Sequence, residues 1–189
     1  VDGKIIPLEI HGVKVMSLGL IAGEDTPVIW RGPIAGKMLQ QFLADVSWGS
    51  LDFLVIDLPP GTGDAQLTLA QTVPISGVVI VTTPQNVALE DVTRGVEMFR
   101  KVDVPILGVV ENMSYFICPC CKDRAPIFGE GGGDKIAAQF GVPLLGRIPI
   151  VPSIREGGDT GTPAASTDSE EGIIFKDIAR QVVERVGAL

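Results

Sequence analysis

Short apolar runs alternate along the chain with segments in which apolar residues recur every three or four positions. The runs predict strands at 12–18, 53–56, 77–81, 106–110 and 143–148. The periodic segments predict helices at 33–46, 65–72, 89–102, 135–140 and 173–186. Because most of the strand runs are apolar without alternation, they indicate strands buried on both faces of a parallel sheet. We expect an α/β fold, with a mostly parallel sheet and helices on both faces.

Ligands of such sheets bind beyond the carboxyl ends of the strands. The residues that follow the predicted strands are therefore the first candidates for function. They form the segments 57–64, 82–86, 111–121 and 149–152.

Composition narrows the class of protein. With 189 residues, 46% of them hydrophobic and 20% charged, the chain can bury a core, and we expect one domain spanning 1–189. The net charge of −8 argues against nucleic-acid binding, which normally needs a basic face. Apolar runs are too short to span a membrane and no secretory signal is visible, so we expect a cytoplasmic protein with no membrane partner.

The segment from Asp57 to Asp64 is the first that could carry chemistry. Asp57 follows an apolar run, where P-loop NTPases place a carboxylate that helps to hold Mg²⁺. The loop of Pro60, Gly61, Thr62 and Gly63 has backbone N–H groups that could approach a phosphate, and Asp64 could orient a water molecule. A plain turn with Asp64 as a helix N-cap explains the same pattern equally well.

The three cysteines lie within four residues, at Cys118, Cys120 and Cys121. The C-x-x-C spacing of Cys118 and Cys121 lets one turn present two thiolates to a metal or cluster. A tetrahedral site needs about four ligands, and His11, the one histidine, is far away in sequence. The missing ligands then come most simply from the same motif of a second chain across a two-fold axis. A redox-active dithiol and an inert surface loop are the alternatives.

Two glycine-rich segments are weaker candidates. The glycines of 128–134 precede a predicted helix and could cradle an anion, although a flexible connector is the favoured interpretation. The segment 32–38 superficially looks like a phosphate-binding loop. Arg31 replaces its first glycine and Met38 its Ser or Thr, so we reject it.

Six segments, in this order, resemble the Mrp/ApbC-type ATPases, the iron–sulfur cluster carriers within the MinD/ParA group of P-loop proteins. They are 28–33, 56–64, 81–85, 111–116, 118–121 and 127–131. The resemblance implies a MinD-like fold and a cytosolic homodimer that binds ATP with Mg²⁺. It also implies a labile [4Fe–4S] cluster that is bridged between the Cys118 and Cys121 pairs of two subunits and handed to apo iron–sulfur proteins.

Carried over by position, the resemblance also implies roles for single residues. Asp57 looks like the Walker-B-type carboxylate, and Gly61 to Asp64 look like the loop that senses the γ-phosphate. Asn112 is similar to the residue that reads adenine. Pro149 and Ile150 stand where the adenine-side loop of the family lies.

One departure from the family is large. Its glycine- and lysine-rich phosphate loop and the strand that leads into it are not found in these 189 residues. We therefore expect a fragment or a degenerate member that does not hydrolyse ATP alone. We also expect an incomplete sheet whose apolar strand edges are exposed or covered by a partner.

Three functions compete at this point. The first is the cluster carrier. The second is a non-hydrolysing pseudo-ATPase that regulates a full-length relative by binding it. The third is a zinc or redox C-x-x-C protein.

Overall fold

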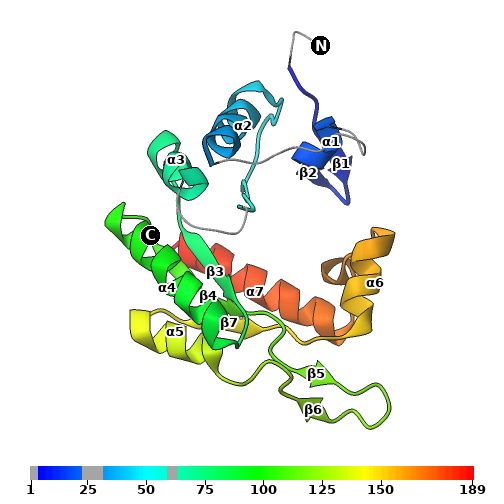
Figure 1. Ribbon diagram of the computed structural model, residues 1–189. Helices are drawn as coiled ribbons and strands as arrows, with labels where there is room; N and C mark the ends of the chain where they lie inside the picture. The colour runs from blue at the N-terminus through cyan, green and yellow to red at the C-terminus, as the bar shows by residue number, and fades with distance from the viewer. Residues whose placement is uncertain (1–3, 23–31, 59–63) are drawn as a thin grey trace. The chain divides into compact units, whose positions relative to one another are not determined.

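Three parallel strands form the central sheet of the computed structural model (Figure 1). They are β3 (Val78–Thr82), β4 (Ile106–Glu111) and β7 (Leu144–Arg147), in the order β3-β4-β7. The structure describes residues 4–22, 32–58 and 64–189. By contacts along the backbone the chain divides into unit 1, Val1–Pro74, and unit 2, Ile75–Leu189. The sheet belongs to unit 2. That the whole chain is one domain stays a prediction.

Helices cover both faces of the sheet, as the apolar runs predict. On one face, Ile80 and Val109 pack against α4 (Asn86–Lys101) and α5 (Gly132–Phe140). On the other, Val110 and Leu145 pack against α7 (Glu170–Val186), with α6 (Pro152–Thr160) adding Ile154. Adjacent residues such as Val109 and Val110 thus serve opposite cores, which is why these strands are apolar without alternation. The predicted α/β class is confirmed.

β3 is an outer strand of this sheet and is paired with β4. Val81 of β3 is 57% exposed, on the face of the sheet that it shares with Val79. The expected incomplete sheet with exposed or partner-covered strand edges stays a prediction.

The described residues of unit 1 contain a hairpin and three helices. β1 (Leu8–Ile10) and β2 (Val13–Val15) are antiparallel, and the hairpin is followed by α1 (Leu18–Ala22), α2 (Gly32–Asp45) and α3 (Asp64–Thr72). The strand predicted at 53–56 is wrong: these residues form no strand, and Val55 is 90% exposed. An apolar run becomes a strand only when neighbouring strands satisfy its backbone groups, and no such pairing is present among the described residues.

Six short elements of the described residues were not expected. They are β1 and α1 in unit 1, and β5 (Phe116–Ile117), β6 (Arg124–Ala125), the helix α6 and the 3₁₀ turn η1 (Ala164–Ser166) in unit 2. Of the helices in the described ranges, none combines the length and apolar character that a bilayer span requires.

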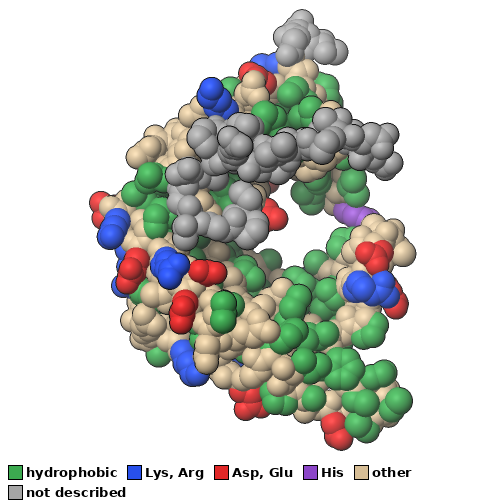
Figure 2. All heavy atoms as spheres, viewed as in Figure 1, with side chains coloured by type: hydrophobic (Ala, Val, Ile, Leu, Met, Phe, Trp, Pro, Cys, Tyr) green, Lys and Arg blue, Asp and Glu red, His purple; other side chains and the backbone are tan. Residues whose placement is uncertain are grey.

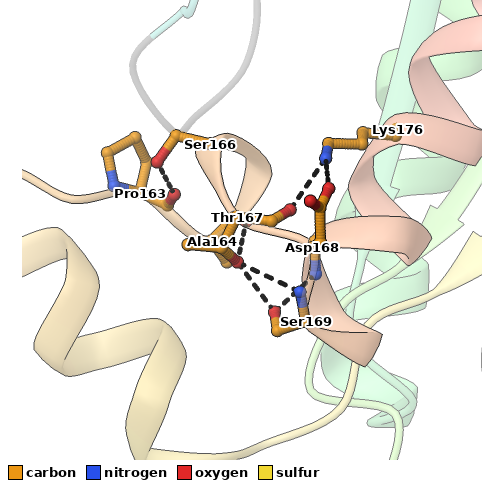
Figure 3. A network of polar contacts seen from close by, with 8 residues as sticks. Pro163, Ala164, Ser166, Thr167, Asp168, Ser169 and Lys176 are labelled. Atoms are coloured by element: carbon orange, nitrogen blue, oxygen red, sulfur yellow. Dashed lines mark hydrogen bonds and ion pairs between the residues drawn. The ribbon is translucent and has the colours of Figure 1, made fainter.

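A polar network fixes the start of α7 (Figure 3). The Ser169 hydroxyl accepts from the Gly172 N–H at 3.0 Å and so caps the helix. The Lys176 ammonium donates to the Thr167 carbonyl and to the Asp168 carboxylate, both at 2.8 Å. This hydrogen bond, together with the charge of Lys176, holds the pKa of Asp168 below its usual 3.8.

Lys176→Met is expected to raise the pKa of Asp168 toward its usual value. The lowered pKa means that ionised Asp168 adds stability above about 3.8, and this is lost as the pH falls through its folded-state pKa. The variant should therefore have a smaller free energy of unfolding at neutral pH, and this free energy should fall less steeply than in the wild type as the pH is lowered. A carboxyl titration by NMR measures the shift, with Lys101→Met as the control. An unchanged Asp168 titration would contradict the prediction.

Candidate functional site

The carboxyl ends of the three strands of unit 2 meet at one edge of the sheet. The Asn112 N–H donates to the Thr82 carbonyl at 2.7 Å, which joins the segments after β3 and β4. The Ile148 N–H donates to the Glu111 carbonyl at 2.9 Å, and the Ser114 N–H donates to the Ile148 carbonyl at 3.0 Å. Three of the four segments expected to hold ligand-binding residues are thus next to one another.

Asn112, Pro149 and Ile150, the predicted adenine-side residues, all lie at this edge. Asn112 is half-buried, and its Oδ1 accepts from the Met113 N–H at 2.9 Å. Met113 has a left-handed backbone with φ of 54°, which is unusual for a residue with a side chain and marks a tight turn. Pro149 is buried and Ile150 is half-buried. Asn112 follows β4, and Pro149 and Ile150 follow β7, so all three residues lie beyond the carboxyl ends of two adjacent strands.

Backbone hydrogen bonds continue from this edge to the cysteines. The Ile150 N–H donates to the Tyr115 carbonyl at 2.7 Å, and the Ile117 N–H donates to the Ile150 carbonyl at 3.4 Å. Phe116 and Ile150 form a parallel bridge. The segment that contains Asn112 therefore runs directly into Cys118 while paired with the segment after β7.

The cysteines occupy the tip of a small antiparallel hairpin. β5 and β6 pair through Phe116 with Ala125 and Ile117 with Arg124, so residues 118–123 form the loop. The Cys118 N–H donates to the Asp123 carbonyl at 3.0 Å, and the Lys122 N–H donates to the Cys118 carbonyl at 2.9 Å. At the base of the hairpin, the Arg124 guanidinium lies 4.6 Å from the centre of the Tyr115 ring.

The hairpin projects from the rest of unit 2 (Figure 1), and hydrophobic side chains gather over it (Figure 2). Ile127, which follows β6, is exposed, and so is Met113 in the turn after β4. A loop with exposed thiols and nearby apolar side chains can approach another protein surface.

The backbone around Cys118 favours the thiolate form of its side chain. All three cysteines are free; Cys118 is half-buried, and Cys120 and Cys121 are exposed. Hydrogen bonds from the backbone N–H groups of Cys121 and then Cys120, aided by the Cys121 side chain, lower the pKa of the Cys118 thiol below 9.0. The same N–H groups stabilise a thiolate, which is the form that metals bind. Within the described residues, no group of three or more Cys, His, Asp or Glu could hold a metal ion.

Of the phosphate-side residues predicted from the sequence, the structure describes Asp57 and Asp64. Asp57 is exposed and does not end a strand. Asp64 is the first residue of α3. Pro60, Gly61, Thr62 and Gly63 lie outside the described residues. Their predicted roles stay predictions.

One cluster at the strand ends was missed. Glu111 is buried beside the start of α5, where its carboxylate accepts from the Gly133 N–H at 2.6 Å. Arg147 and Asp134 form an ion pair of 2.5 Å next to it. A single acidic residue after five apolar or glycine positions, 106–110, was the available sequence signal. The first turn of α5, at the end of the glycine-rich segment 128–134, therefore binds a carboxylate of the chain itself.

Known proteins resemble this chain over nearly its full length. A family model described as "ParA: NUBPL iron-transfer P-loop NTPase" matches residues 1–183. The iron–sulfur cluster transfer protein NUBPL of Dictyostelium discoideum is 51% identical over 185 residues, covering 97% of this chain and 57% of that protein. An iron–sulfur cluster carrier protein of Aquifex aeolicus is 52% identical over 187 residues, covering 96% and 51%.

Two solved structures share the fold. A nucleotide-binding protein of Archaeoglobus fulgidus in complex with ADP has a TM-score of 0.68 at 38% identity, covering 86% of this chain and 63% of that one. The cell division ATPase MinD of Pyrococcus furiosus has a TM-score of 0.55 at 25% identity, covering 82% and 59%. The chain thus spans between about half and two thirds of the length of these proteins.

Proposed function

This chain belongs to the NUBPL-type iron-transfer P-loop NTPases of the ParA group, and from this premise we propose that its cysteine hairpin carries an iron–sulfur cluster for delivery to acceptor proteins. The observation that carries the proposal is the hairpin loop with Cys118 and Cys121 three residues apart. The loop is closed by backbone hydrogen bonds. Hydrogen bonding from the backbone of Cys121 and of Cys120 lowers the pKa of the Cys118 thiol.

We propose that the cargo is a [4Fe–4S] cluster bridged between two copies of this chain. Such a cluster is held by about four thiolates, and one hairpin offers the pair of Cys118 and Cys121. A two-fold axis through the cluster supplies the second pair from the same residues of the other copy. The projecting hairpin leaves room for this meeting because its tip lies away from the body of unit 2 (Figure 1).

Adenine nucleotide is the second proposed ligand, with ATP and Mg²⁺ as the form used in the family. The arrangement of Asn112, Pro149 and Ile150 at the strand ends fits an adenine-side contact, and the related Archaeoglobus protein is in complex with ADP. The phosphate-side roles of Asp57, the loop 60–63 and Asp64 are part of the same proposal. The lysine-bearing phosphate loop is not among these 189 residues, so hydrolysis is not proposed for this chain alone.

Apo iron–sulfur proteins are the proposed acceptors. A related protein of Arabidopsis thaliana, 50% identical over 185 residues, has the name "Iron-sulfur protein required for NADH dehydrogenase, mitochondrial". Which acceptor this chain serves, and the cytoplasmic location expected from the sequence, stay predictions.

Loading the chain with iron and sulfide under strictly oxygen-free conditions tests the function. We expect a brown protein with about two iron and two sulfide per chain, and a dimeric mass that reverts to a monomer when the cluster is removed. A loaded protein of monomeric mass would contradict the bridge. Tightly held zinc with no visible absorbance would instead support a zinc protein.

A further inference from the structure

Glu111 is a buried carboxylate in an otherwise apolar strand. Its side chain is 1% exposed, at the end of β4 and directly before Asn112. An ionised carboxylate is costly to bury unless hydrogen bonds and a counter-charge compensate it. Its partners therefore indicate what the residue does.

Those partners come from three different segments. The Ser114 hydroxyl donates to one carboxylate oxygen, and the Gly133 N–H donates to the other at 2.6 Å. The Arg147 guanidinium lies 3.7 Å from Glu111 and also pairs with Asp134. Glu111 thus joins the turn after β4, the start of α5 and the end of β7.

The start of α5 is shaped to reach this carboxylate. A Cβ on Gly133 would lie 2.9 Å from the Glu111 Cβ and 2.9 Å from Leu144 Cδ1. Helix N-termini attract negative charge because their first N–H groups lack partners within the helix. Glycine here lets the helix N-terminus come close enough for a direct bond to Glu111.

The turn held by Glu111 leads to the cysteines. Ser114 is buried, and besides its bond to Glu111 its backbone N–H is bound to Ile148. Three residues separate Ser114 from Cys118, and the carbonyl of Tyr115, the first of them, accepts from the Ile150 N–H. The hydrogen bond from the Ser114 hydroxyl to Glu111 helps to hold the left-handed turn at Met113, and loss of this bond weakens the turn.

We propose that Glu111 is a positioning residue whose carboxylate fixes the Asn112–Ser114 turn and, through it, the cysteine hairpin at the sheet edge. This deepens the proposed function and rests on it for its consequence on the cluster. A purely structural role in the core would instead weaken unit 2 as a whole.

Site-resolved hydrogen exchange separates the two possibilities. Glu111→Gln removes the charge, Ser114→Ala removes the hydroxyl and keeps the carboxylate, and Glu97→Gln on the exposed face of α4 is the matched control. We expect the amides of Ser114, Ile117 and Cys118 to exchange about tenfold faster in both test variants. The exchange rates of the core amides of β3 should stay unchanged in both test variants. In Glu97→Gln, all of the exchange rates should match those of the wild type. Equal acceleration throughout unit 2, or none, would overturn the proposal.

The loaded protein provides the second measurement. Transfer of iron to an added chelator should be about tenfold faster in Glu111→Gln and Ser114→Ala than in the wild type and Glu97→Gln. If amide exchange is locally faster but iron is transferred to the chelator at the wild-type rate, the proposed effect of Glu111 on the cysteines is overturned. Should the wild type take up no cluster, the proposed function fails, while hydrogen exchange still decides whether Glu111 fixes the turn.

Discussion

Replacing either Cys118 or Cys121 with alanine is expected to abolish retention of iron and sulfide, whereas Cys120→Ala retains both. Each copy contributes two ligands to a bridged cluster, so one substitution removes two of about four thiolates from the dimer. Visible absorbance, iron and sulfide content after anaerobic loading, and the mass of the loaded protein measure the effect.

Cys120→Ala is a matched control because it makes the same chemical change in the same loop. Cys120 and Cys121 are both exposed, so neither substitution should alter the free energy of unfolding by more than about 0.5 kcal/mol. The Cys120 backbone N–H near the Cys118 sulfur survives the substitution. Loss of the cluster from Cys120→Ala, or its retention by Cys121→Ala, would show that the ligand pair is wrongly assigned.

The sequence predicted the sheet of unit 2 well, because there the local pattern and the final burial agree. The runs at 77–81, 106–110 and 143–148 became β3, β4 and β7, and no strand end differs from its prediction by more than one residue. Helices on both faces followed from the same pattern, since a strand apolar on both faces must be covered twice.

The run at 53–56 shows the limit of that reasoning. Its residues are as apolar as those of β3, yet Phe53, Leu54 and Val55 are exposed. Apolar side chains favour burial, whereas a strand also needs other strands, far away in sequence, to pair with its backbone. Asp57 was placed at a strand end on the same argument, so its predicted position fails while its predicted role remains open.

The site was predictable where it depends on residue spacing and not where it depends on side-chain packing. The C-x-x-C spacing and the strand-end positions of Asn112 and Pro149 could be found from the sequence. The bond from Gly133 to Glu111 could not, because it joins residues 22 positions apart through the packing of α5 on the sheet.

Gly132→Ala is expected to destabilise the protein by roughly 1–3 kcal/mol, the usual cost of overfilling a packed site. A Cβ on Gly132 would lie 2.7 Å from the Pro84 Cα and 2.8 Å from the Pro84 carbonyl oxygen. Both are backbone atoms of the segment between β3 and α4, so α5 must move away from the strand ends. That movement also lengthens the bond from the Gly133 N–H to Glu111. Urea unfolding measures the loss.

The same substitution at Gly95, in the middle of α4, should have the opposite sign. A Cβ there meets nothing within 4 Å, and alanine favours a helix over glycine by about 1 kcal/mol. Gly95→Ala should therefore stabilise the protein by up to that amount and leave the exchange of the Ser114 amide unchanged. Stabilisation by both substitutions would show that α5 can withdraw from Pro84 at no cost. The close approach of the helix N-terminus to Glu111 would then not depend on glycine at position 132.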